Sequence, residues 1–280
     1  AVYFSLKDAE DGSVISCFMW RNTYQLLGVE FEIGLEVILV GHPEIYKPNG
    51  RLSFATSSIE LVGEGALRKQ YEKLKAQLTK EGLFDLARKR PLPFLPQRIG
   101  LITSRDGAAI GDFQVNLGNF GFKVSMIDSR VEGQLATQEL FSSLRTFRNK
   151  DIEVLVLVRG GGSLESLLPF NNEMLVREVA SFPVPVLVGV GHEKDISLVG
   201  LAADRMVSTA TAAAEALNKS WQETSANIGL YQQKILSSFE RSLLQEQNSV
   251  GHSFQVMKDG LRIILDNFSR AEQALDRAFV

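Results

Sequence analysis

Two apolar runs, at residues 152–158 and 183–190, contain almost no polar position. Runs of this kind, rich in β-branched residues, are typical of strands that are buried on both faces of a parallel sheet. Each run is followed by residues that can bind a ligand or take part in a reaction. Arg159 and three glycines follow the first run, and the segment 191–195 follows the second. Because ligands bind at the carboxyl ends of strands in open parallel sheets, this pattern predicts a functional site there.

Further elements surround these two strands. The pattern predicts strands at 98–104 and 122–127, helices at 108–117, 138–147 and from Leu164 onward with Ser163 as N-cap, and a loop at 202–211. Strand and helix alternate throughout this region, which favours a doubly wound α/β domain.

Residues 2–61 show a different, all-β pattern. Short apolar segments at 2–6, 14–20, 36–40, 52–54 and 59–62 are separated by turn residues at 11–12, 34, 42–43 and 48–50. The segment carries several aromatic residues, among them Tyr3, Phe4, Phe18, Trp20, Tyr46 and Phe54. An oligonucleotide/oligosaccharide-binding (OB) barrel uses such rings to stack on single-stranded bases, although aromatic rings more often fill a core.

A helix and a linker follow this β-rich module. Residues 66–78 carry apolar side chains at helical spacing, and residues 80–96 contain three prolines, which end helical structure. The linker also carries the basic triplet Arg88, Lys89 and Arg90. Such a triplet is suited to phosphate, but a solvated run of charge is the more common case.

After Ala212 the apolar positions recur in steps of three and four to the end of the sequence. Sustained heptads of this length predict a coiled coil or a long helical arm that needs a partner surface. Ile235, Phe239 and Leu243 step by four twice, which is a stutter that locally unwinds a supercoil.

The composition of the chain limits which partners and which cellular location are expected. The 280 residues carry a net charge of −3, which gives no support for bulk affinity for nucleic acid but leaves room for a local basic groove. No apolar run is long enough to span a bilayer, so no membrane partner is expected. Cys17 is the single cysteine, which excludes an intrachain disulfide and makes the cytoplasm the default location. The opening residues lack the features of a signal peptide and resemble a strand already under way, which suggests a piece of a longer chain.

The glycine-rich turn after the first buried strand is a candidate phosphate cradle. Backbone N–H groups of Gly160, Gly161, Gly162 and Ser163 can approach an anion, and Arg159 adds a forked cation beside them. The spacing matches neither a Walker loop nor a dinucleotide-binding motif. A tight packing turn remains the alternative reading of three glycines.

His192 is the best candidate for a general acid/base or a nucleophile, and Asp195 follows it by three residues. Asp112, in the helix after a neighbouring strand, would complete a site for phosphodiester hydrolysis. Two carboxylates are also able to hold a divalent metal such as Mg²⁺, and the residues alone leave this choice open.

Taken together, the motifs resemble those of the large subunit of bacterial exodeoxyribonuclease VII. The resemblance is carried by the motifs at 63–67, 81–85, 89–93, 100–104, 107–109, 158–165, 170–171, 189–193 and 212–215, together with Asp112, Glu173 and Asp195, and by Tyr3 to Asp8 in the barrel. The family pattern places its functional positions at Asp112, Arg159, His192 and Asp195. This sequence departs from the pattern at Gly111, where the family tends to have a basic residue, at Asn172, where it usually has aspartate, and at Ala210, where it has proline.

The resemblance implies an enzyme that cuts single-stranded DNA from its ends to oligonucleotides. It divides the chain into a partial OB-fold barrel at 1–65, a helix and linker at 66–97, an α/β catalytic domain at 98–215 and a helical coiled-coil arm at 216–280. The arm is expected to bind several copies of a small helical subunit, and both the start of the barrel and the distal arm are expected to be missing. The rival readings are a non-catalytic scaffold that binds single-stranded DNA with a decayed site, and an α/β protein that binds a phosphate ligand.

Overall fold

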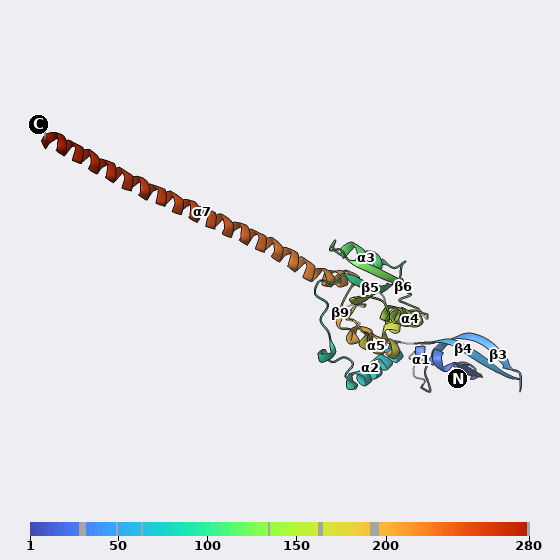
Figure 1. The fold of residues 1–280 in the computed structure, drawn as a ribbon. Coiled ribbons are helices and arrows are strands. Elements are labelled where there is room, and N and C mark those ends of the chain that lie inside the picture. Colours follow the sequence, from blue (N-terminus) through green and yellow to red (C-terminus); the bar gives the residue numbers. More distant parts are fainter. Residues whose placement is uncertain are drawn as a thin grey trace. The chain divides into compact units, whose positions relative to one another are not determined.

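The computed structural model describes residues 1–27, 32–48, 50–62, 64–133, 135–161, 165–190 and 196–278. The chain divides into two compact units, Ala1–Trp221 and Gln222–Val280. The first unit holds two sheets with their helices, and the second consists of most of one long helix (Figure 1). No helix in the described ranges is both long and apolar enough to cross a membrane.

The N-terminal sheet has four strands in the order β1 (Val2–Lys7), β2 (Val14–Met19), β4 (Arg51–Leu61) and β3 (Val37–Tyr46). β1 pairs with β2 and β3 with β4 in antiparallel fashion, whereas β2 and β4 run parallel. A short helix, α1 (Arg21–Leu27), lies between β2 and β3 in the chain, so the prediction that this region is all-β was wrong.

Two predicted boundaries in this sheet were also wrong. The expected turn at 42–43 lies inside β3, where Pro43 pairs with Phe54 and a register shift falls between Val40 and Gly41. Proline is tolerated there because β3 is an edge strand, whose outer N–H groups need no partner in the sheet. The segments 52–54 and 59–62, expected as separate strands, belong to the single strand β4.

The second sheet has five strands in the order β6 (Lys123–Asp128), β5 (Arg98–Thr103), β7 (Val154–Val158), β8 (Val186–Gly189) and β9 (Arg205–Val207). Every neighbouring pair is parallel, as predicted for the apolar runs. The carboxyl ends of all five strands therefore meet at one edge. β9 lies where a loop was expected at 202–211, so that part of the prediction was wrong.

Alternate side chains of this sheet belong to two hydrophobic clusters. Leu155 and Leu157 of β7 pack in one cluster, and Val154, Val156 and Val158 pack in the other. The helices that follow the N-terminal sheet are α2 (Glu64–Lys80), η1 (Leu86–Arg88), α3 (Ala108–Asn116), α4 (Ala136–Arg148), η2 (Glu165–Asn171), α5 (Glu173–Ala180), α6 (Leu198–Ala202) and α7 (Ala210–Ala278). The first cluster includes side chains of α4, α5 and α6, and the second includes side chains of α3 and the start of α7. The sheet is thus covered by apolar contacts on both faces.

The helix predicted from Leu164 onward is a 3-10 helix, η2, followed by the α-helix α5. Pro169 lies inside η2 and has no N–H to donate to an α-helical ladder. Asn172 then caps α5, because its side chain accepts hydrogen bonds from the N–H groups of Met174 and Leu175. Ser163 and Leu164 lie outside the described residues.

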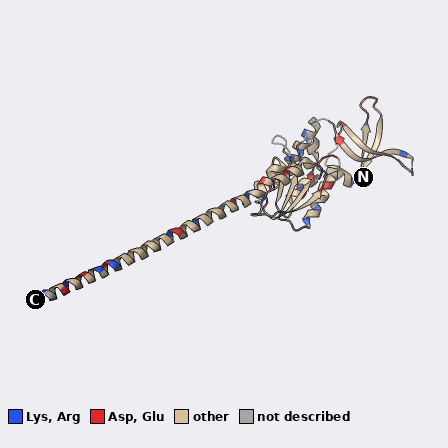
Figure 2. Cartoon of the chain, turned by 90° about the horizontal axis from the view of Figure 1, so that it is seen from above, with Lys and Arg blue, Asp and Glu red and all other residues tan. Residues whose placement is uncertain are grey.

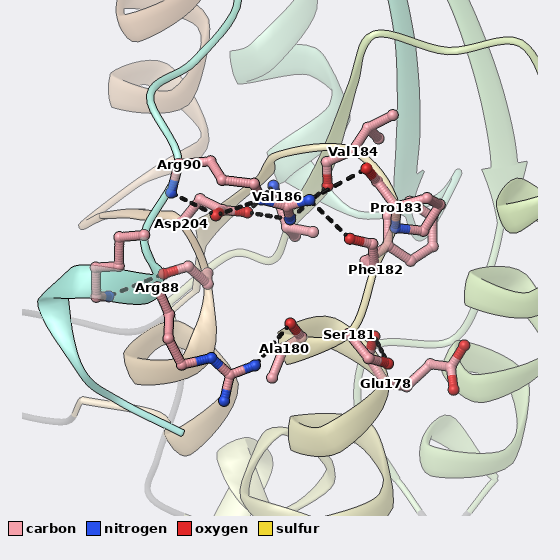
Figure 3. Close-up of polar contacts among 12 residues, drawn as sticks. Arg88, Arg90, Glu178, Ala180, Ser181, Phe182, Pro183, Val184, Val186 and Asp204 are labelled. Carbon is pink, nitrogen blue, oxygen red and sulfur yellow. Dashed lines mark hydrogen bonds and ion pairs between the residues drawn. The ribbon is translucent and has the colours of Figure 1, made fainter. Parts of the chain in front are cut away.

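The residues of the basic triplet hydrogen-bond to other parts of the chain, and Figure 3 shows these contacts for Arg88 and Arg90. Arg88 donates to the carbonyl of Ala180, and Lys89 donates to the carbonyls of Leu201 and Ala203. Arg90 pairs with Asp204 and donates further to carbonyls just before β8. The triplet therefore fastens the proline-rich linker to the α/β region, which corrects the reading from sequence.

The helix α7 runs without interruption from Ala210 to Ala278 (Figure 1). Within the second unit its large apolar side chains are exposed, including Ile235, Phe239 and Leu243 of the predicted stutter. Acidic and basic residues are interspersed along it (Figure 2).

Candidate active site at the carboxyl edge of the parallel sheet

The strand register places Arg159 at the carboxyl edge of the sheet. Val158 pairs with Gly189 at the ends of β7 and β8, and the N–H of Arg159 donates to the Gly189 carbonyl at 3.1 Å. β5, whose last residue is Thr103, lies on the other side of β7. The carboxyl ends of β5, β7 and β8 are therefore neighbours.

Arg159 is the most informative residue at this edge, because its charge is buried. Its side chain is only 2% exposed, and one guanidinium nitrogen, Nη2, lies 3.4 Å from Oε2 of Glu132. The other terminal nitrogen, Nη1, is buried and has no hydrogen-bond partner among the described residues. Burying a charged donor without a partner costs several kcal/mol, roughly, unless an anion satisfies it. The guanidinium is thus ready to bind an anion.

Glu132 reaches Arg159 from the loop between β6 and α4. The preceding residue, Val131, is buried, and the following Gly133 has φ of +82°, a conformation that favours glycine. These two residues fix the course of the loop, while the Glu132 side chain stays 68% exposed. Sequence analysis missed Glu132, because no motif includes it and it lies 27 residues before Arg159.

Thr103 adds a second polar group without a partner near this edge. It is the last residue of β5, it is 1% exposed, and its hydroxyl Oγ1 has no hydrogen bond in the described part of the chain. Its carbonyl accepts from the N–H of Ser129. The sequence contained Thr103 within a family motif but offered no reason to assign it a role of its own.

Asp112 lies on α3, the helix that follows β5, and its side chain is exposed to solvent. Its carbonyl accepts a hydrogen bond of 2.8 Å from Asn116. No hydrogen bond or ion pair joins Asp112 to Arg159 in the described structure. α3 is fixed at its end by Asn218, which donates to the carbonyl of Asn116 and accepts from the N–H of Gly118.

Part of the predicted site lies outside the described residues, namely Gly162, Ser163, His192 and Asp195. Of the described glycines, Gly160 is half-buried and Gly161 is exposed. A Cβ atom added at Gly160 would meet no atom within 4 Å, so close packing does not explain glycine at this position. An open approach to the backbone is what a phosphate cradle requires.

The described residues on either side of 191–195 are buried or hydrogen-bonded to other parts of the chain. Val190, before it, is buried. After it, the Ile196 carbonyl accepts a 2.8 Å hydrogen bond from the hydroxyl of Tyr71, and the Leu198 N–H donates to Asn171 at 2.9 Å. Asn171 and Asn172 therefore have structural roles, since Asn171 accepts from the Leu198 N–H and Asn172 caps α5.

The structure shows the surroundings of the three positions that depart from the family pattern. Gly111 is exposed and has open space around it, so a basic side chain would fit there. Asn172 caps α5 with a side-chain oxygen that a carboxylate would also supply. Ala210 begins α7 directly after Thr209, whose hydroxyl caps the helix through the N–H of Ala212. Alanine and proline are both accepted at a first helical position.

No group of three or more His, Cys, Asp or Glu side chains within the described ranges is arranged to hold a metal ion. Asp112 belongs to these ranges, whereas His192 and Asp195 do not.

A second candidate surface lies on the N-terminal sheet. Tyr3 and Trp20 are 79% and 67% exposed, and Phe18, which pairs with Tyr3 in the register, is half-buried between them. Ring centroids are 6.3 Å apart for Tyr3 and Phe18 and 6.2 Å apart for Phe18 and Trp20. We refer to these three rings as the aromatic strip. Tyr46 is also exposed, whereas Phe4 and Phe54 are half-buried.

Comparison with known proteins agrees with this arrangement. A family described as "Exonuclease VII, large subunit" matches residues 83–279, and one described as "OB-fold nucleic acid binding domain" matches residues 1–60. The chain is 40% identical over 216 residues to the exodeoxyribonuclease 7 large subunit of Streptococcus pneumoniae serotype 2 (strain D39 / NCTC 7466), a match that covers 76% of this chain and 48% of that protein.

A second relative is the exodeoxyribonuclease 7 large subunit of Thioalkalivibrio sulfidiphilus (strain HL-EbGR7). It is 38% identical over 245 residues, which is 86% of this chain and 54% of the relative. The chain thus spans about half the length of the curated relatives that it matches. Since the first family match extends over well more than half of the sequence, the chain belongs to the exonuclease VII large-subunit family.

Proposed function

We propose that this chain acts in an exodeoxyribonuclease VII as its large, catalytic subunit. It would hydrolyse phosphodiester bonds of single-stranded DNA from the ends and release oligonucleotides. The single observation that supports this most strongly is Arg159, a buried cation with an unpartnered Nη1 at the carboxyl edge of a parallel sheet. Such a donor is suited to the charge that develops on phosphoryl oxygens during hydrolysis.

Each candidate residue has a role in this proposal. Arg159 and the turn formed by residues 160–163 hold the scissile phosphate. His192 acts as general acid/base or as nucleophile, and Asp195 orients it. Asp112 positions the attacking water or a divalent metal. A bound metal would stabilise negative charge on the phosphoryl oxygens.

The N-terminal sheet and α7 are proposed to bind the DNA and the small subunit. The aromatic strip of the N-terminal sheet is proposed to stack on the bases of single-stranded DNA, supported by the exposure of Tyr3 and Trp20. α7 is proposed to form a coiled-coil arm that binds several copies of a small helical subunit, supported by its exposed apolar side chains.

The proposal keeps the division into an OB-fold part at 1–65, a helix and linker at 66–97, a doubly wound catalytic part at 98–215 and an arm at 216–280. Apolar clusters on both faces of the parallel sheet support the doubly wound arrangement. A cytoplasmic location is proposed because the single cysteine, Cys17, is buried and free. A scaffold that only binds DNA is less favoured, because the site residues are intact and the family is that of a nuclease.

The test uses the complete large subunit, co-expressed with its small subunit, on end-labelled single-stranded DNA with and without EDTA. We expect short oligonucleotide products from the wild-type complex and none from His192→Ala. His252→Ala is the matched control, because His252 lies exposed on α7. Loss of cleavage in EDTA would establish a metal requirement. Tight binding without cleavage by the wild-type complex would refute the catalytic function and support the scaffold.

A further inference from the structure

The contact between Arg159 and Glu132 joins a buried cation to an exposed anion. The guanidinium is 2% exposed and the carboxylate 68% exposed, and Nη2 lies 3.4 Å from Oε2. Glu132 does not satisfy the cation fully, because Nη1 keeps no partner among the described residues. An anion that binds at Nη1 therefore binds next to a carboxylate that is already in place.

This arrangement has a consequence for the charge of the bound anion. Arg159 contributes one positive charge and Glu132 one negative charge, so the pair has no net charge. Nη1 of Arg159 can still donate a hydrogen bond to an anion. Coulomb energies scale with the product of the charges, so Glu132 repels a dianion about twice as strongly as a monoanion at the same place. A phosphodiester carries one negative charge, whereas a phosphomonoester carries nearly two above its second pKa of about 6.

We infer that Glu132 is a specificity-determining residue, which cancels the preference that Arg159 alone would have for a dianionic terminal phosphate and so lowers the competition of such ends with the monoanionic phosphodiester of a DNA chain. The inference rests on the proposed nuclease function. It deepens that function, because an enzyme whose products are oligonucleotides with end phosphates benefits when those ends bind poorly at the site.

The local structure supports a role of this kind for Glu132 rather than a role in folding. Val131 is buried and Gly133 has φ of +82°, so the loop is shaped by the residues on either side of the carboxylate. The neighbouring Arg130 has its own carboxylate partner, Glu139, which accepts from its N–H at 2.8 Å. Removal of the Glu132 charge leaves these interactions in place.

The experiment measures binding of two matched probes to the complete subunit complex at pH 8, by nuclear magnetic resonance titration. The probes are thymidine 5′-monophosphate, a dianion, and its methyl ester, a monoanionic diester. For Glu132→Gln we expect the methyl ester to bind about 3-fold more tightly, as for charges about 6 Å apart in water-like surroundings. The monophosphate should then bind about 9-fold more tightly, because its energy change is doubled. Asp151→Asn is the control: it removes a carboxylate, 85% exposed, that precedes β7 at the opposite edge of the sheet, and neither affinity should change.

Three outcomes would overturn the inference. Equal changes for the two probes, or no measurable binding of either, would show that charge selection is absent. Weaker binding by Glu132→Gln would show that the carboxylate only holds Arg159 in position. Cleavage of single-stranded DNA is measured separately on the same samples. A wild-type complex that binds the probes as expected but does not cleave would refute the proposed function and leave the charge selection standing.

Discussion

Arg90 and Asp204 lie 114 residues apart in the chain and are joined by two side-chain hydrogen bonds, Nε to Oδ1 at 2.9 Å and Nη2 to Oδ2 at 2.8 Å. The Asp204 carboxylate also accepts from the backbone N–H of Arg90 and of Val186, and its side chain is only 7% exposed (Figure 3). One aspartate thus ties the linker to the amino end of β8, whose carboxyl end leads into the candidate site.

Asp204→Ala should destabilise the chain by about 3 kcal/mol, because it leaves Arg90 and two backbone N–H groups without their acceptor. The free energy of unfolding, measured by urea titration, checks this. Lys69→Ala serves as the control, since Lys69 and Glu32 form an exposed ion pair at 3.0 Å and its loss should cost less than about 1 kcal/mol. Similar losses in the two variants would contradict the structural role of Asp204.

Asp204 should also make stability depend on pH in the acid range. Burial raises the pKa of its carboxyl, but the hydrogen bonds from Arg90 and Val186 outweigh burial and lower the pKa below its ordinary value. Because the unfolded chain then binds the proton more readily, the contribution of Asp204 is present above the ordinary carboxyl pKa and disappears as the pH falls through the folded value.

Urea titrations of wild type and Asp204→Asn between pH 6 and pH 3 measure this contribution. We expect the difference in unfolding free energy between the two proteins to be largest near neutrality and to shrink below about pH 4. A difference that stays constant over this range would show that Asp204 keeps an ordinary pKa in the folded state.

Arg159→Lys should lower kcat on single-stranded DNA by about 100-fold or more, as expected when a donor to developing charge is lost. An ammonium cannot present the planar, two-pronged donor set of a guanidinium. Arg130→Lys is the matched control on the exposed side of the same edge, where Arg130 pairs with Glu139. Circular dichroism of both variants would show that the fold is retained. Near-normal turnover by Arg159→Lys would remove Arg159 from the active site.

Trp20→Ala should weaken binding of single-stranded DNA by about 5- to 150-fold, since stacking of one base on one ring contributes about 1–3 kcal/mol. Fluorescence anisotropy of a labelled oligonucleotide measures the affinity. Phe94→Ala controls for aromatic rings in general, because Phe94 is exposed but belongs to the linker. Equal effects of the two substitutions would mean that the aromatic strip is not the binding surface.

Asn172→Ala should destabilise the chain by about 1 kcal/mol, because the N–H groups of Met174 and Leu175 lose their cap. Asn172→Asp keeps an oxygen acceptor at the start of α5 and should restore most of that stability. Thermal unfolding compares these variants with Asn149→Ala, an exposed asparagine after α4. If Asn172→Asp were as unstable as Asn172→Ala, the capping role would be wrong.

Several elements could be predicted from local pattern because the pattern reports on burial directly. The apolar run at 152–158 became β7, and the helical spacing at 66–78 became α2. The short strand β9 was missed, because Arg205 to Val207 lacks a long apolar run and is held as a strand by pairing with β8. Pro43 was misread for a similar reason: whether proline ends a strand depends on whether that strand lies at a sheet edge.

The sequence by itself determined the buried strands of the parallel sheet, the long α7, the family and a candidate site around Arg159. Each of these depends on neighbours in the chain or on a motif of a few residues. Only the tertiary structure decided that the basic triplet is bound to carbonyls and to Asp204, and that Glu132 faces Arg159. Those partners are 114 and 27 residues apart, and no local periodicity specifies which distant donor and acceptor will meet once the sheet has formed.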